Sequence, residues 1–275
     1  MAIPEGLKGK VLSSDGNAIA YDRSGEGPPL ILVDGAFCHR SFGPTPKLAP
    51  LLAKHFTVIS YDRRGRGESG DTAPYAVERE IEDLKALVDA AGGSVFLYGT
   101  SSGAVLALRA VASGLDVRKL ALFEPPLVIA GSPPPVQPDL KPQIAEMVAA
   151  GRRGDAVKTF MKMVGVPAVF IPLMRIMPGV WSKLTAVAHT LPYDFAVLGD
   201  TGAGKPLPGE LTQAMASIKV PTLVADGGKS PKWMHHTAEV VAEAIPHAQR
   251  RTLEGQNHNV SEKAIAPVLV EFFRD

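Results

Sequence analysis

Residues 99–103 constrain the fold of this chain more than any other segment, because they place a serine on a turn between a strand and a helix. They read GTSSG, after the apolar run 94–98 and before the helical run 104–112. In this context a G-x-S-x-G segment predicts a sharp turn that exposes the serine hydroxyl. The glycines leave room for close packing of the helix while the serine backbone is strained. Ser101 is the candidate nucleophile, because only this serine has a glycine two positions away on either side.

Short apolar runs alternate with amphipathic segments over most of the chain. The expected strands are 10–14, 18–22, 29–33, 57–61, 94–98, 120–123, 222–225 and 250–253, and the expected helices are 78–91, 104–112, 237–244 and 264–273. Such alternation predicts a mostly parallel sheet with helices on both faces. We expect the functional site at the carboxyl ends of its strands.

The alternation stops between residues 126 and 211. Prolines interrupt this stretch, and five of the eight methionines lie in it. We interpret it as a helical insertion above the strand ends, which divides the core into residues 1–125 and 212–275. The methionines either fill the core of this insertion or line an apolar substrate pocket. The candidate pocket residues are Met161, Met174, Met177 and His189.

Composition argues against several classes of function. The 275 residues carry 29 basic and 28 acidic side chains without a basic stripe, so we expect no binding to nucleic acid. The single cysteine, Cys38, cannot form an internal disulfide, and residues 1–10 lack the apolar core of a secretory signal. No apolar run approaches membrane-spanning length, so no membrane association is expected. These features favour a cytoplasmic protein, monomeric or homodimeric, whose partner is a small-molecule substrate.

The order of these signals resembles the α/β-hydrolase superfamily. The chain has a hairpin start, a strand that ends at Asp34-Gly35, the turn 62–69, the GTSSG turn, and a late histidine within GQNHN at 255–259. The resemblance covers the whole chain. It implies an α/β-hydrolase fold with a mostly parallel central sheet, helices on both faces and a helical cap inserted after the sixth strand. It also implies that nucleophile, acid and histidine follow one another in the sequence.

His258 is the candidate general base. It follows the last expected strand, so we expect it at the same sheet edge as Ser101. A serine hydroxyl is a weak nucleophile until a neighbouring imidazole takes its proton. His235 and His236 lie near the start of an expected helix, where we expect them to face solvent.

The acid departs from the common pattern of the superfamily. Members usually carry an aspartate a few residues after the seventh strand, where this chain has Ser230 in GGKS. Glu124 directly follows the sixth strand, and some members, among them pancreatic lipases and zearalenone lactonase, place the acid there. The longer glutamate side chain helps to span the added distance. Asp226, at the end of the seventh strand, is the alternative acid, and a site without a functional acid is the third possibility.

The resemblance also implies an oxyanion hole. A tetrahedral intermediate needs two preorganised backbone donors, one from Ser102 and the other from Ala36 or Gly35. Asp34 replaces the usual histidine of this loop, and we interpret it as a structural residue or, less favoured, as a polar group that supports the site from behind. Together with Glu124, this pattern looks more like the zearalenone lactonase branch than like generic esterases.

These residues indicate a serine hydrolase without cofactor or metal. We expect it to cleave a carboxylic ester or lactone of a small to medium apolar substrate through an acyl-enzyme on Ser101. Carbon–carbon bond hydrolysis or perhydrolysis with the same triad is one alternative. A non-catalytic ligand-binding or sensor protein on the same fold is another, supported by the serine at position 230.

Overall fold

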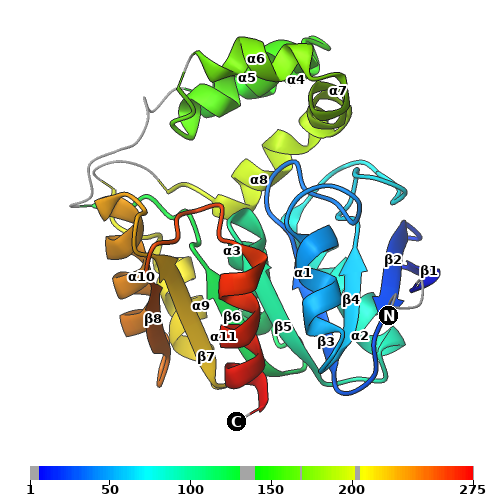
Figure 1. Cartoon of the computed structure of the whole chain (residues 1–275), viewed down its shortest axis with the longest axis vertical. Helices are drawn as coiled ribbons and strands as arrows, with labels where there is room; N and C mark the ends of the chain where they lie inside the picture. Colours follow the sequence, from blue (N-terminus) through cyan, green and yellow to red (C-terminus); the bar gives the residue numbers. More distant parts are fainter. Residues whose placement is uncertain (1–5, 131–139, 168, 202–204, 275) are drawn as a thin grey trace.

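An eight-stranded sheet forms the centre of the molecule (Figure 1). The structure is a computed structural model that describes residues 6–130, 140–167, 169–201 and 205–274. The strands are β1 (Leu7–Leu12), β2 (Ala18–Ser24), β3 (Pro29–Val33), β4 (Thr57–Tyr61), β5 (Val95–Thr100), β6 (Val117–Phe123), β7 (Thr222–Gly227) and β8 (Gln249–Leu253). Their order in the sheet is β1-β2-β4-β3-β5-β6-β7-β8. The pairs of β2 with β1 and with β4 are antiparallel, and the other pairs are parallel.

Helices cover both faces of this sheet. One face packs against α1 (Thr45–Leu52) and α11 (Glu262–Arg274), and the other against α2 (Val77–Ala90), α3 (Ser102–Ala112), α9 (Gly209–Ser217) and α10 (Lys232–Ala244). Alternate residues of a strand point to opposite faces of the sheet. In β3, Leu30 and Leu32 pack against the first layer of helices, whereas Ile31 and Val33 pack against the second. Burial on both faces explains why the central strands are continuous apolar runs in the sequence.

A group of helices lies above the carboxyl ends of the strands (Figure 1). They are α4 (Leu140–Ala149), α5 (Arg153–Met163), α6 (Phe170–Ile176), α7 (Pro178–Val187), the 3-10 turn η1 (Ala188–Thr190) and α8 (Leu191–Leu198). Their apolar cluster includes Ile144, Val157 and Leu184, and α8 descends from it to contact α3. None of the helices in the described ranges is long and apolar enough to cross a membrane.

The predicted architecture is confirmed, whereas several element boundaries differ. The sheet is mostly parallel, helices cover both faces, and the helical cap follows β6. β6 begins at Val117 rather than at Leu120, because Val117 pairs with Val95 although the charged Arg118 and Lys119 interrupt the apolar pattern. Pairing with a neighbouring strand extends an element beyond its apolar run. The division at residues 125 and 211 stays a prediction.

Candidate active site

The turn between β5 and α3 holds Ser101 in a strained backbone conformation, with φ 55° and ψ −131°. A Cβ atom on Gly99 would lie 2.6 Å from the Cα of Ala104. One on Gly103 would lie 2.2 Å from the carbonyl oxygen of Val33. Both distances are far shorter than van der Waals contact, which confirms that the turn requires glycine at these two positions.

The structure brings Ser101, His258 and Glu124 together at the carboxyl end of the sheet. His258 lies in the loop between β8 and α11, with Nε2 3.2 Å from the Ser101 Oγ. Its Nδ1 atom is 2.7 Å from the Oε2 atom of Glu124. The imidazole therefore lies between a hydroxyl and a carboxylate, which is the arrangement that proton transfer from a serine requires.

Glu124 is held at the end of β6 by hydrogen bonds to its neighbours. Its backbone amide donates to the carbonyl of Ala225 at 3.0 Å, and its Oε1 atom accepts from the amide of Gly227 at 2.7 Å. The side chain is fully buried. Burial raises the pKa of this carboxyl, but His258, Ser230 and the Gly227 amide outweigh it, so the pKa lies below its ordinary value. The carboxylate is thus charged at neutral pH and faces the imidazole.

Asp226, the alternative acid, faces a different histidine. Its Oδ2 atom contacts the Nδ1 of His235, and its Oδ1 atom accepts from the Thr252 hydroxyl at 3.0 Å and lies 3.5 Å from the Arg250 Nε. His235 was expected to face solvent, but its side chain is only 26% exposed, because it lies near the start of α10 and contacts Asp226 at the end of β7. Helical periodicity alone does not reveal this contact.

The segments proposed to form the oxyanion hole lie beside Ser101. Ser102 is the first residue of α3, where backbone amides have no intrahelical acceptor and the helix dipole favours negative charge. A Cβ on Gly35 would lie 2.8 Å from the Cβ of Ser101, so the loop after β3 contacts the serine closely. Ala36 follows in the same loop and packs against the cap cluster. The role of these amides stays a prediction.

The four residues predicted to line a pocket have different surroundings. Met161 and Met174 pack against the apolar cluster of the cap, whereas Met177 is 49% exposed. The Nε2 atom of His189 lies 3.6 Å from the Oδ2 of Asp71, and burial lowers the pKa of its imidazole. Their contact with a substrate stays a prediction. Among the described residues, no group of three or more His, Cys, Asp or Glu side chains has a geometry that holds a metal ion.

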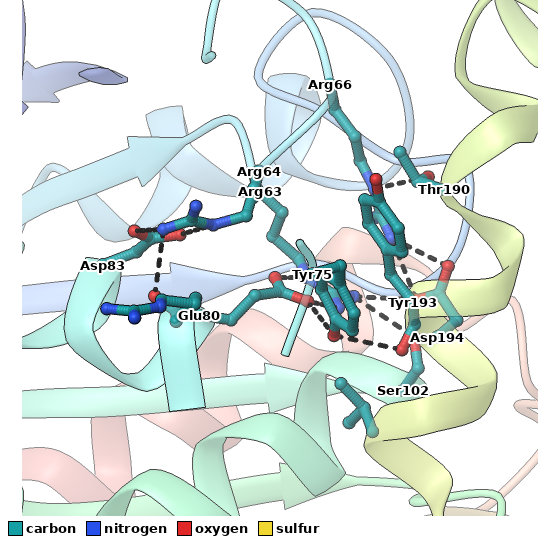
Figure 2. Close-up of polar contacts among 12 residues, drawn as sticks. Arg63, Arg64, Arg66, Tyr75, Glu80, Asp83, Ser102, Thr190, Tyr193 and Asp194 are labelled. Carbon is teal, nitrogen blue, oxygen red and sulfur yellow. Dashed lines mark hydrogen bonds and ion pairs between the residues drawn. The ribbon is translucent and has the colours of Figure 1, made fainter. Parts of the chain in front are cut away.

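Sequence reasoning missed a buried charged cluster around Ser102, the residue after the candidate nucleophile (Figure 2). Asp194 of α8 is 2% exposed and contacts Ser102, Arg63 and Arg66. The one hint of this cluster in the sequence is an aspartate inside the otherwise apolar segment 191–198. The sequence does not reveal which side chains neutralise its charge.

The fold is that of the α/β hydrolases, and comparison with known proteins gives the family. The model of the alpha/beta hydrolase family matches residues 14–269, and this chain belongs to that family. Pimeloyl-(acyl-carrier protein) methyl ester esterase of Xanthomonas campestris pv. campestris is similar, with 27% identity over 244 residues, which are 86% of this chain and 90% of that protein.

Solved structures show the same fold. An α/β hydrolase from Sphaerobacter thermophilus is 56% identical and superimposes with a TM-score of 0.87, covering 96% of this chain and 100% of that one. The enol-lactonase from Burkholderia xenovorans is 20% identical, with a TM-score of 0.71 over 97% of this chain and 100% of its own. At that identity the likeness shows the fold alone. The finer resemblance to zearalenone lactonase stays a prediction.

Proposed function

We propose that this protein is a serine hydrolase that cleaves carboxylic esters or lactones. The observation that carries the proposal is the continuous contact from the Ser101 hydroxyl through His258 to the buried Glu124 carboxylate. The relation to a methyl ester esterase supports ester cleavage. The site supplies a nucleophile, a base and an orienting acid, so the chemistry needs only water as second reactant.

In the proposed mechanism the Ser101 oxygen attacks the substrate carbonyl while the Nε2 atom of His258 takes its proton. Glu124 holds the imidazole in the reactive tautomer and stabilises the imidazolium. The amides of Ser102 and of Ala36 or Gly35 donate to the oxyanion. His258 then protonates the leaving oxygen, which breaks the ester bond and leaves an acyl-serine. A water molecule, deprotonated by the same histidine, attacks this acyl-enzyme and frees the acid and the serine.

An apolar acyl group or ring fits the cap that lies above this site. Phe37, in the loop after β3, packs edge to face against Phe160 of the cap at 5.0 Å between ring centroids. Phe160 in turn lies 6.2 Å from the ring of Phe195. Because these rings and the neighbouring methionines are apolar, we expect neutral substrates to be preferred over charged ones.

Labelling with a fluorophosphonate tests the proposal. This probe forms a tetrahedral adduct with an activated serine, and mass mapping should find one adduct on Ser101 and none in Ser101→Ala. Glu124→Gln should lower kcat for a neutral ester by roughly 10³- to 10⁴-fold, because the amide favours the wrong imidazole tautomer. Asp226→Asn is the matched control at the neighbouring strand end and should keep kcat within about threefold.

Other results would contradict parts of the proposal. A folded protein without an adduct would show that the serine is not activated and would favour a ligand-binding protein. A full adduct without cleavage of any ester or lactone would direct the search to carbon–carbon bond hydrolysis or perhydrolysis. Normal activity in Glu124→Gln, with loss in Asp226→Asn, would show that the acid is assigned wrongly.

A further inference from the structure

The Asp194 carboxylate joins the cap to the segment that carries the nucleophile (Figure 2). Asp194 lies on α8, and its Oδ1 atom accepts a hydrogen bond from the Ser102 hydroxyl at 2.7 Å. The same carboxylate accepts from Arg63 Nη1 at 2.8 Å and from Arg66 Nη2 at 2.8 and 2.9 Å. All four side chains are at least 97% buried. A charged group so deeply buried is stable only with such partners.

The two arginines continue from Asp194 to the loop after β3. Arg66 Nη1 donates to the carbonyl of Gly35 at 2.6 Å and to that of Cys38 at 3.3 Å. Arg63 Nη1 donates to the carbonyl of Asp34 at 3.3 Å. Both segments that carry the proposed oxyanion donors, the start of α3 and the loop 34–38, therefore connect to one carboxylate of the cap.

The charges of this cluster balance. Glu80 accepts from Arg63 at 2.7 Å through both of its oxygens, so two guanidinium groups face two carboxylates. Burial raises the pKa of Asp194, but Arg66 and Arg63 outweigh it, so the carboxyl has a pKa below its ordinary value. The cluster remains charged at neutral pH, and its hydrogen bonds keep the strength and direction that ionised partners provide.

We propose that Asp194 is a positioning residue that holds the Ser102 amide and the loop 34–38 in the geometry of the oxyanion hole. The inference rests on the proposed hydrolase function. Backbone donors stabilise a developing oxyanion only when they lie about 2.7–3.1 Å from its position, and small displacements cost large factors in rate. Because Asp194 belongs to α8, the placement of the cap helix and the geometry of the oxyanion hole are coupled.

Ser102→Ala provides the sharpest test, because it removes only one hydroxyl, which donates to Asp194 and accepts from Arg63 Nη1 at 3.4 Å. The backbone amide of residue 102 stays, and both arginines keep their carboxylate, so the variant should fold. With p-nitrophenyl butyrate we expect kcat to fall about tenfold while KM stays within about twofold, as is typical when an interaction acts in the transition state. Asp194→Asn should lower kcat further, and adding Ser102→Ala to it should have little additional effect.

Tyr75→Phe is the matched control. It also deletes one hydroxyl from the cluster, but this hydroxyl donates to Glu80 at 2.9 Å and to the carbonyl of Tyr193 at 3.2 Å, whereas that of Ser102 donates to Asp194. We expect a loss of stability similar to that of Ser102→Ala, measured by urea unfolding, with kcat within about twofold of the wild type. If the two variants lose similar stability but only Ser102→Ala loses kcat, the Ser102 hydroxyl positions the site and does not merely stabilise the fold.

The outcomes distinguish this inference from the proposed function. If the wild type forms the fluorophosphonate adduct but Ser102→Ala and Tyr75→Phe both keep wild-type kcat, the cluster only fastens the cap and the inference is wrong, while the hydrolase assignment stands. If the wild type forms no adduct on Ser101, the proposed function fails and the inference fails with it. Should Asp194→Asn not fold, Ser102→Ala and its control still decide.

Discussion

At the scale of single residues, burial decides how the polar groups of this chain behave. Asp34 stands where the family usually has a histidine, and the expectation that it is structural agrees with its contacts. Its carboxylate accepts from the Thr45 hydroxyl at 2.7 Å, and its side chain is almost fully buried. Burial raises the pKa of Asp34 to about 6, because this single hydroxyl and the more distant Arg66 and Arg63 offset only part of the lost hydration.

This pKa predicts how Asp34→Asn changes stability with pH. The folded pKa is raised above the unfolded value of about 4, so between these values the folded state holds a proton that the unfolded state has released. The contribution of Asp34 to stability therefore falls as pH rises from about 4 to 6. Asparagine does not titrate and still accepts from Thr45. The free energy of unfolding of the variant, relative to that of the wild type, should therefore rise by about 2 kcal/mol from pH 4.5 to pH 7. Urea unfolding of the wild type and the variant at pH 4.5 and at pH 7 measures this change. The same stability difference between the two proteins at both pH values would contradict the prediction.

At the scale of elements, the start of α3 packs very closely against the end of β3, and only glycine at position 103 allows this approach. Gly103 faces the carbonyl oxygens of Val33 and Asp34, at 2.2 and 2.6 Å from the position of an added Cβ. Backbone atoms cannot move aside as a flexible side chain does. The turn before α3 therefore depends on packing against a strand that lies about 70 residues earlier in the chain.

Gly103→Ala should consequently destabilise the protein by about 3 kcal/mol, in the upper range of overpacking effects. Gly209→Ala is its control: this glycine is the first residue of α9, its added Cβ meets no atom within 4 Å, and alanine loses less conformational entropy there. The control should be neutral or slightly more stable. Equal midpoints of urea unfolding for the two variants would disprove the packing argument.

At the scale of the whole molecule, aromatic stacking joins the cap to the core. The rings of Tyr75, before α2, and Tyr193, on α8, stack with centroids 3.9 Å apart and an angle of 4° between their planes. The Tyr193 hydroxyl also donates to the Asp71 carboxylate at 3.0 Å, but this hydrogen bond is exposed. The stacked rings thus account for more of the contact than the hydroxyl does.

Tyr193→Ala should therefore lower the free energy of unfolding by about 1–3 kcal/mol and increase hydrogen exchange in α8, because the ring contact is lost. Tyr193→Phe keeps the ring and should stay within about 0.5 kcal/mol of the wild type, as expected for loss of an exposed hydrogen bond. Chemical unfolding and amide exchange measure both effects. If the phenylalanine variant lost as much stability as the alanine variant, the hydroxyl rather than the stacking would hold α8.

The amino-acid sequence alone indicated the strands of the sheet, four of the helices that cover it and the position of the serine turn, but neither α1 nor α9. Apolar periodicity and glycine spacing are local properties, and they indicated the strands that carry Ser101 and Glu124 and the loop that carries His258. The sequence also placed the cap after β6, because the alternation of strands and helices stops there.

Only the tertiary structure decided which carboxylate faces which histidine. Glu124 and Asp226 both end neighbouring parallel strands, and the chain offers seven histidines. The choice depends on side-chain direction at the strand ends and on the packing of α10, which brings His235 to Asp226 and leaves Glu124 for His258. The Asp194 cluster depended on the fold in the same way, because its members are up to 131 residues apart in the chain and meet only when α8 lies on α3.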